Sequence, residues 1–185
     1  MELLQDRREL SFALQIILQK IGVPERILEI GLYKGGTFRL WQTISSKTST
    51  LIGIDLADYT RGCFGDDCRV SLIFGKSSDN PEVIRKVSEI LGISKLDLLF
   101  IDGNHGYEMV KSDYESYSPF VRDNGLIVFH DTGNLQVSPR SSPKGCQVQR
   151  FWRELLDRHT VKEYYEFCMN ASLPQGQMGT GIVIK

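Results

Sequence analysis

The chain has 185 residues, of which 41% are hydrophobic, so it can bury one core of good size. Lys and Arg total 22 and Asp and Glu total 23, and this balance leaves no bulk basic field to hold nucleic acid. No apolar run approaches the roughly 20 residues that cross a bilayer, and residues 1–10 lack a signal-peptide core. We therefore expect a single cytoplasmic domain over residues 1–185 that binds neither nucleic acid nor membranes.

The N-terminal segment, residues 1–24, is predicted to be helical. Its central part, residues 10–18, is apolar on more than one face. Such a helix is rarely left exposed, so we expect it to cover a site as a lid or to form the interface of a homodimer.

Short apolar runs then alternate with segments of helical period. The runs have the length and β-branched content of strands, and they fall at residues 26–30, 50–54, 70–74, 96–101, 125–129, 161–169 and 181–184. Helices are expected between them, including residues 81–91, with Asn80 or Asp79 as the cap and Gly92 at the end, and residues 148–159. Continuous apolar strands covered on both faces indicate a Rossmann-like, doubly wound α/β fold. We expect a mostly parallel seven-stranded sheet whose last two strands form an antiparallel pair.

A glycine turn joins the first strand to the next helix through Gly31, Gly35 and Gly36. Glycines let the backbone turn tightly and let a ligand approach the main chain. Asp55 ends the second strand about 20 residues later, the place from which a carboxylate binds ribose hydroxyls. The two features together imply a ligand that contains a nucleoside. The turn lacks the G-x-G-x-x-G pattern of dinucleotide sites, although a nicotinamide-dependent reductase remains an alternative.

Polar residues follow two later strands abruptly. Asp102, Asn104 and His105 follow residues 96–101, and His130 and Asp131 follow residues 125–129. Ligands of a parallel sheet bind beyond the carboxyl ends of its strands, so these carboxylates and imidazoles are expected to converge on one point. Two converging carboxylates could share a divalent cation.

His105 has three interpretations. It could be the general base for a substrate hydroxyl, because histidine ordinarily titrates near neutrality, or it could be a third metal ligand. It could also be a structural imidazole that caps the helix starting near Gly106. Glu108 and Asp113, further along that helix, are expected on its solvent-facing surface. Residues 132–147, rich in Ser, Pro and Gly, are expected to form a loop that closes over substrate.

The segments EIGLYKGGT, IGIDL, DLLFIDGNHGYE and GLIVFHDT, followed by GCQVQRFWREL, resemble class I S-adenosylmethionine-dependent methyltransferases. The resemblance is to the family with cephalosporin-hydroxylase-like proteins and small-molecule O-methyltransferases, and it covers roughly residues 25–185. It implies S-adenosylmethionine as the cofactor and a small-molecule acceptor. It also implies roles for single residues: Glu29 supports the cofactor indirectly, Gly31 and the turn Lys34, Gly35, Gly36 and Thr37 flank its methionine part, Asp55 holds the ribose, Ser77 and Ser78 lie near the adenine, and Asp102 lies on the cofactor side.

The resemblance further implies a metal site at Asp102 and Asp131. Metal-dependent relatives usually place two oxygen ligands after the fifth strand, whereas here His130 precedes Asp131. Oxygen ligands suit magnesium, and an imidazole shifts the preference toward manganese, iron or zinc. We expect a divalent cation, Mg or Mn, held by Asp102, His130 and Asp131, with Asp102 and His105 as the catalytic pair. The alternative is a cofactor- or metal-binding protein that transfers no methyl group.

Overall fold

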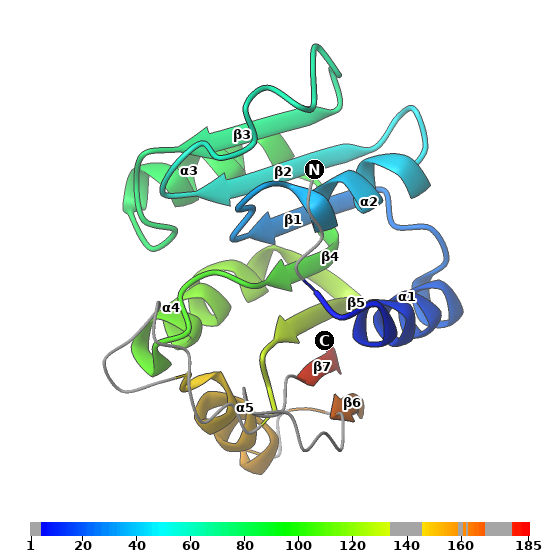
Figure 1. Ribbon diagram of the computed structural model, residues 1–185, viewed down its shortest axis with the longest axis vertical. Helices are drawn as coiled ribbons and strands as arrows, with labels where there is room; N and C mark the ends of the chain where they lie inside the picture. The colour runs from blue at the N-terminus through cyan, green and yellow to red at the C-terminus, as the bar shows by residue number, and fades with distance from the viewer. Residues whose placement is uncertain (1–4, 134–145, 159–160, 162, 169–178) are drawn as a thin grey trace.

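The computed structural model describes residues 5–133, 146–158, 161, 163–168 and 179–185. Strands and helices alternate along most of this part of the chain (Figure 1). In chain order the elements are α1 (Arg7–Ile21), β1 (Arg26–Ile30), α2 (Gly36–Ile44), β2 (Thr50–Asp55), β3 (Val70–Phe74), α3 (Pro81–Leu91), β4 (Leu96–Ile101), α4 (Tyr107–Tyr117), the 3-10 turn η1 (Ser118–Phe120), β5 (Val121–His130), α5 (Val148–Asp157), β6 (Glu163–Cys168) and β7 (Gly179–Ile184). Among the described residues, no helix is both long and apolar enough to cross a membrane.

The strands form one seven-stranded sheet in the order β3-β2-β1-β4-β5-β7-β6. The first five strands pair in parallel, while β7 pairs antiparallel with both β5 and β6. The predicted fold class, a mostly parallel Rossmann-like sheet with an antiparallel C-terminal pair, is confirmed. The last strand in the chain lies inside the sheet, between β5 and β6.

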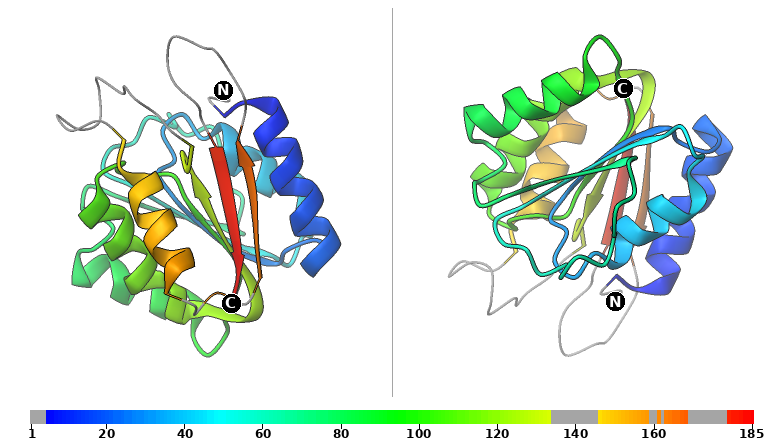
Figure 2. Two further views of the ribbon diagram at one scale, coloured as in Figure 1. Left: turned by 90° about the horizontal axis from the view of Figure 1, so that it is seen from below. Right: turned by 90° about the horizontal axis from the view of Figure 1, so that it is seen from above.

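Helices cover both faces of the sheet, as two further views show (Figure 2). Helices α3, α4 and α5 pack on one face, where their apolar residues join alternate strand residues such as Ile127 and Phe129 in one core cluster. Helices α1 and α2 pack on the other face, where Leu126 and Val128 belong to a second cluster. Successive side chains of a strand point to opposite faces, which explains this division of β5.

Several element boundaries differ from the prediction. Helix α1 begins at Arg7, three residues before the apolar part predicted at residues 10–18, because Asp6 caps it by accepting a hydrogen bond from the Arg8 backbone N–H. Strand β5 begins at Val121, where it already pairs with Leu96 of β4, ahead of a shift in register. Helix α3 has its predicted bounds, with Asn80 as its cap. Residues 134–145 of the predicted loop over substrate lie outside the described residues.

Strands β1 and β4 are neighbours in the sheet. From β1 the chain adds β2 and β3 on one side, and from β4 it adds β5 on the other, so the strand order reverses between β1 and β4. Sheets of this kind bind ligands in the crevice beyond the carboxyl ends of the strands at such a point. Here the loops after the strands are tied together, because the Gly31 backbone N–H donates to Ile54 and the Asp102 N–H donates to Ile30.

Candidate cofactor and cation site

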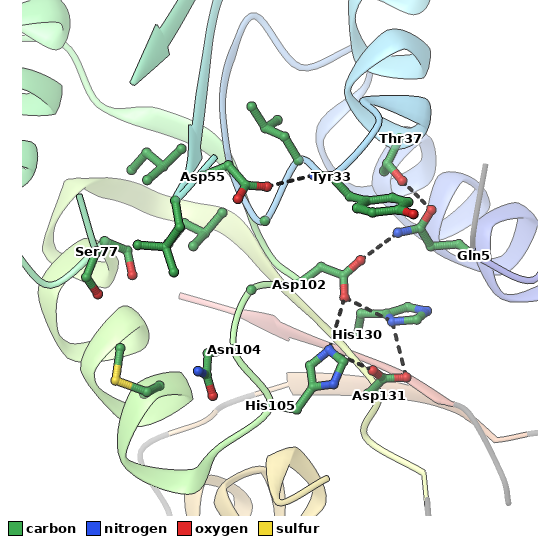
Figure 3. Close-up of a pocket in the computed structure, with 18 of the residues that line it drawn as sticks. Gln5, Tyr33, Thr37, Asp55, Ser77, Asp102, Asn104, His105, His130 and Asp131 are labelled. Atoms are coloured by element: carbon green, nitrogen blue, oxygen red, sulfur yellow. Dashed lines mark hydrogen bonds and ion pairs between the residues drawn. The ribbon is translucent and has the colours of Figure 1, made fainter. Parts of the chain in front are cut away.

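A pocket of about 590 Å³ lies beyond the carboxyl ends of β1, β2, β4 and β5 (Figure 3). Its volume is within the range of small-molecule sites. Most of the residues predicted for the site line it, namely Gly31, Gly36, Thr37, Asp55, Ser77, Ser78, Asp102, His105, His130 and Asp131. Glu29, Lys34 and Gly35 do not belong to this lining.

The glycine turn has its shape for reasons of packing. Gly31 has φ +90°, and a Cβ atom there would lie 2.0 Å from the backbone oxygen of Asp102. Gly35 has φ +75°, and a Cβ atom there would lie 2.5 Å from the ring of Phe64. Only glycine therefore lets the turn lie against the end of β4 and beneath Phe64.

Asp55 links two of the loops that line the pocket. Its Oδ2 accepts a hydrogen bond of 2.7 Å from the Tyr33 backbone N–H, and its Oδ1 accepts one of 3.3 Å from Ala57. Figure 3 shows the carboxylate at the pocket, beside the turn. The position suits a contact with the hydroxyls of a ribose.

Glu29 is a buried residue of β1 that is only 1% exposed. Its Oε2 accepts a hydrogen bond of 2.6 Å from Nε1 of Trp41 on α2. Burial, and then the nearby Asp102 carboxylate, raise the pKa of Glu29 well above its usual range. Glu29 thus joins β1 to α2 under the turn without reaching the pocket.

The expectation that Asp113 faces solvent is wrong. Asp113 is 1% exposed, and its Oδ1 accepts a hydrogen bond of 2.5 Å from Ser78 Oγ. Tyr117, one turn further along α4, donates to the backbone oxygen of Ser78. Burial raises the pKa of Asp113 to about 7. The inner face of α4 therefore holds the loop that carries Ser77 and Ser78, whereas Glu108 is exposed as predicted.

Carboxylates and imidazoles meet at the other end of the pocket, as Figure 3 shows. Nδ1 of His130 lies 3.2 Å from Oδ1 of Asp102 and 3.3 Å from Oδ1 of Asp131. Nε2 of His105 lies 3.1 Å from Oδ2 of Asp131 and 3.9 Å from Oδ1 of Asp102. The structure thus brings together the polar residues that follow β4 and β5.

His105 does not cap α4. The N-cap residue is Gly106, and the side chain that binds this turn is that of Asn104, which accepts a hydrogen bond of 2.8 Å from the Gly106 N–H. The structural interpretation of His105 as a cap is therefore wrong, and its imidazole faces Asp131 instead.

His130 and Asp131 shift each other's pKa in opposite directions. Burial disfavours its protonated form, but the carboxylates of Asp102 and Asp131 more than offset this and raise the pKa of His130 well above its usual range. Burial alone would raise the pKa of Asp131. The interactions with His130 and His105 outweigh burial, so that the pKa of Asp131 is lowered. Asp131 also has φ +61°, in the left-handed region that non-glycine residues rarely adopt.

The donor set fits a divalent cation. Neither ring nitrogen of His130 makes a hydrogen bond within the described part of the chain, although Nδ1 faces two carboxylate oxygens. Ligand atoms of Asp102, His130 and Asp131 all lie within 4.8 Å of one another. A cation among them would offset the repulsion between the two carboxylates and bind Nδ1 of His130, the nitrogen that faces them.

Two further residues, one just before α1 and one in its first turn, reach the site although the sequence did not predict them there. Gln5 lines the pocket, donates to Oδ2 of Asp102 at 2.5 Å and accepts from Thr37 Oγ1 at 2.5 Å. Glu9 is fully buried, with Oε2 3.3 Å from Nε2 of His130. Glu9 lies four residues before Ala13 and eight before Ile17, on the same face of the helix. A charged residue on this apolar stripe was the one indication in the sequence that Glu9 is buried.

Residues 28–132, more than half of the chain, match the family model described as a methyltransferase domain. The chain therefore belongs to this methyltransferase family, as the resemblance predicted. It is 29% identical over 129 residues to L-olivosyl-oleandolide 3-O-methyltransferase of Streptomyces antibioticus, over 66% of this chain and 32% of that protein. The curated relatives are longer, since the matched region covers 55% of one and smaller shares of the others.

Solved structures have the same fold. The O-methyltransferase of Bacillus cereus, in complex with SAH, superposes with a TM-score of 0.68 and 15% identity, covering 99% of this chain and 93% of that one. The MycE methyltransferase of the mycinamycin biosynthetic pathway, in complex with Mg, SAH and mycinamycin VI, superposes with a TM-score of 0.64 and 19% identity, over 95% of this chain and 48% of that one.

Proposed function

We propose that this protein transfers the methyl group of S-adenosylmethionine to a hydroxyl oxygen of a small molecule, with the help of a divalent cation. The observation that carries the proposal is that one continuous pocket contains Asp55 and the glycine turn at one end and the Asp102–His130–Asp131 cluster at the other. Family membership supports it, as do the O-methyltransferase names of the relatives and the SAH bound in solved neighbours.

The proposal assigns each part of the cofactor to residues at the pocket. Asp55 would bind the ribose hydroxyls, and Ser77 and Ser78 would lie along the adenine. The turn from Gly31 to Thr37 would flank the methionine part, which directs the sulfonium toward Asp102. Holding donor and acceptor in line is the main contribution that a protein makes to such a displacement.

Bound S-adenosylmethionine supplies an electrophilic methyl carbon: a bond forms between that carbon and the acceptor oxygen while the carbon–sulfur bond breaks and its electron pair stays on sulfur. The acceptor hydroxyl also loses a proton, for which His105 is the candidate base. Its imidazole lines the pocket, and the Asp131 carboxylate 3.1 Å away would stabilise the imidazolium that forms.

Asp102, His130 and Asp131 would hold the cation. When bound, the cation lowers the pKa of the acceptor hydroxyl and orients its oxygen. The magnesium in the MycE complex supports this part of the proposal. His130 in place of an oxygen donor favours manganese over magnesium.

Calorimetric titration with S-adenosylhomocysteine and with NADH tests the cofactor. We expect S-adenosylhomocysteine to bind at micromolar to submillimolar concentrations and NADH not to bind. Transfer of a radiolabelled methyl group to catechol or to a glycosylated macrolide, with and without manganese, then tests the reaction. Binding of NADH alone would establish the reductase alternative, and binding of S-adenosylhomocysteine without transfer to any hydroxyl acceptor would leave a cofactor-binding protein.

A further inference from the structure

Helix α1 places a fully buried carboxylate, that of Glu9, against the ring of His130. We propose that Glu9 is a positioning residue: it orients the His130 imidazole so that Nδ1 is presented to the cation as a ligand. The inference rests on the proposed function, because it needs a cation at Asp102, His130 and Asp131. It assigns the N-terminal helix a role in the chemistry of the site.

The strand geometry brings the two residues together. His130 lies at the end of β5 and points to the same face as Val128, toward α1. Thr180 of β7 is its partner in the sheet, and the Thr180 hydroxyl donates to Oε2 of Glu9 at 3.4 Å. Oε2 of Glu9 is therefore shared between Thr180 and Nε2 of His130, which is 3.3 Å away.

A buried carboxylate is costly unless a donor faces it. Leu10, Ala13 and Ile17 surround Glu9 on the buried stripe of α1, where an apolar residue would pack at lower cost. Oε1 of Glu9 has no hydrogen-bond partner among the described residues. The N–H at Nε2 of His130 is the donor that can compensate the charge, and this explains a glutamate at this position.

The contact decides which ring nitrogen faces the pocket. With a proton on Nε2 facing Glu9, a cation would take the place of the proton on Nδ1, which lies 3.2 Å from Asp102 and 3.3 Å from Asp131. A carboxylate on the far nitrogen of a ligating histidine fixes its tautomer and makes the near nitrogen a better electron donor. Glu9 would thereby strengthen the preference for manganese or cobalt over magnesium.

The test compares the affinity of the wild type and of Glu9→Gln for Mn²⁺. The amide is nearly isosteric but uncharged, and we expect Mn²⁺ to bind about 10- to 100-fold more weakly, the usual cost of losing such a partner. Affinity for S-adenosylhomocysteine should stay within twofold. Thr180→Val is the matched control, because it removes the other contact of the same oxygen and should change Mn²⁺ affinity by less than threefold.

A spectroscopic readout separates positioning from folding. In the wild type loaded with Co²⁺, the Nε2 proton should give a strongly shifted, slowly exchanging NMR signal that is lost in Glu9→Gln. In a His130→Gln background, Glu9→Gln should weaken Mn²⁺ binding no further, because the two residues act through one contact.

The outcomes distinguish the two proposals. If the wild type binds neither Mn²⁺ nor Co²⁺, the cation part of the proposed function fails, and this inference fails with it. If the wild type binds Mn²⁺ and Glu9→Gln binds it within twofold of the wild type, only the role of Glu9 is refuted. An equal loss with and without His130 would likewise refute it and mark Glu9 as structural. If Glu9→Gln does not fold, the absence of the exchangeable signal from the Co²⁺-loaded wild type would refute it.

Discussion

Asp55 is the residue on which nucleoside binding is expected to depend most. Replacing it with Ala removes an acceptor for ribose hydroxyls and an anchor of the Tyr33 turn, so S-adenosylhomocysteine should bind about 1.5–3 kcal/mol more weakly, the scale of a hydrogen bond to a charged group. Calorimetry measures the change. Asp58→Ala is the control, because the Asp58 carboxylate accepts hydrogen bonds from Thr60 in the same loop and does not line the pocket. Equal losses in the two variants would mean that the loop, and not the carboxylate of Asp55, determines affinity.

Asp113 should make stability depend on pH. Its pKa is about 7 in the folded protein and near 3.8 when unfolded, so the folded state holds the proton more tightly. The stabilisation is fully present below about pH 3.8 and is lost as the pH rises through about 7. Asp113→Asn should therefore gain stability relative to wild type between pH 5 and pH 8, by at most about 3 kcal/mol, because only the two pH units from 5 to the folded-state pKa contribute.

Urea unfolding at the two pH values measures this difference. Asp79→Asn is the control, since exposed Asp79 contributes to the raised pKa of Asp113 only as a minor charge. Parallel pH profiles for the wild type and Asp113→Asn would contradict the assignment.

The sequence predicted the residues of the site that follow strands, because the direction of a parallel sheet brings their ends together. It did not reveal the residues that helices contribute. On α4, Val110, Asp113 and Tyr117 share the buried face at spacings of three and four, so a helical reading could have placed Asp113 inside. Glu9 could not be paired with His130 in advance, because they meet only through the packing of α1 on β5 and β7.

At the scale of the elements, the glycine turn after β1 should tolerate no side chain at Gly31. Gly31→Ala combines a left-handed backbone with a clash against the Asp102 backbone, and we expect it to cost at least about 3 kcal/mol of stability. Gly62→Ala is the matched control, with φ +70° and no atom within 4 Å of the added Cβ, and it should cost only about 1–2 kcal/mol. Denaturant unfolding compares them, and similar losses would show that backbone strain alone acts at Gly31.

The apolar runs located all seven strands, but their ends depend on contacts that the runs do not contain. Because Asp6 caps α1, the helix begins at Arg7 and includes three charged residues, Arg7, Arg8 and Glu9, that precede its apolar part. Pairing with β4 extends β5 to Val121. The position of β7 between β5 and β6 follows from the sheet as a whole, since its own six residues would suit an edge as well.

At the scale of the whole molecule, a divalent cation should raise the melting temperature. A ligand that binds only the folded state at 100 times its Kd adds about 2.7 kcal/mol, which is roughly 5–10 °C for a chain of this size. Asp131→Asn should lose most of this gain and retain binding of S-adenosylhomocysteine. The measurement is thermal unfolding with Mn²⁺, with Mg²⁺ and with EDTA.

An unchanged melting temperature in both metals would contradict the cation site. A more stable double variant, Asp102→Asn with Asp131→Asn, that still transfers methyl groups would also contradict it.

The predicted homodimer stays a prediction. Helix α1 packs its buried face on β5, β6 and β7 of its own sheet, and Leu18 on its other side is 47% exposed.

The position of β7 has a consequence for synthesis on the ribosome. Every pocket-lining residue from Gln5 to Asp131 is translated before β7, yet β5 keeps an open edge until Gly179–Ile184 has emerged. Until then His130 lacks its strand partner, and Glu9 lacks the Thr180 hydroxyl. At about 5–20 residues per second, the nascent chain spends several seconds with Asp102, His130 and Asp131 synthesised but β7 absent. A stalled chain that ends before residue 179 is therefore expected to expose β5 as an aggregation-prone edge strand.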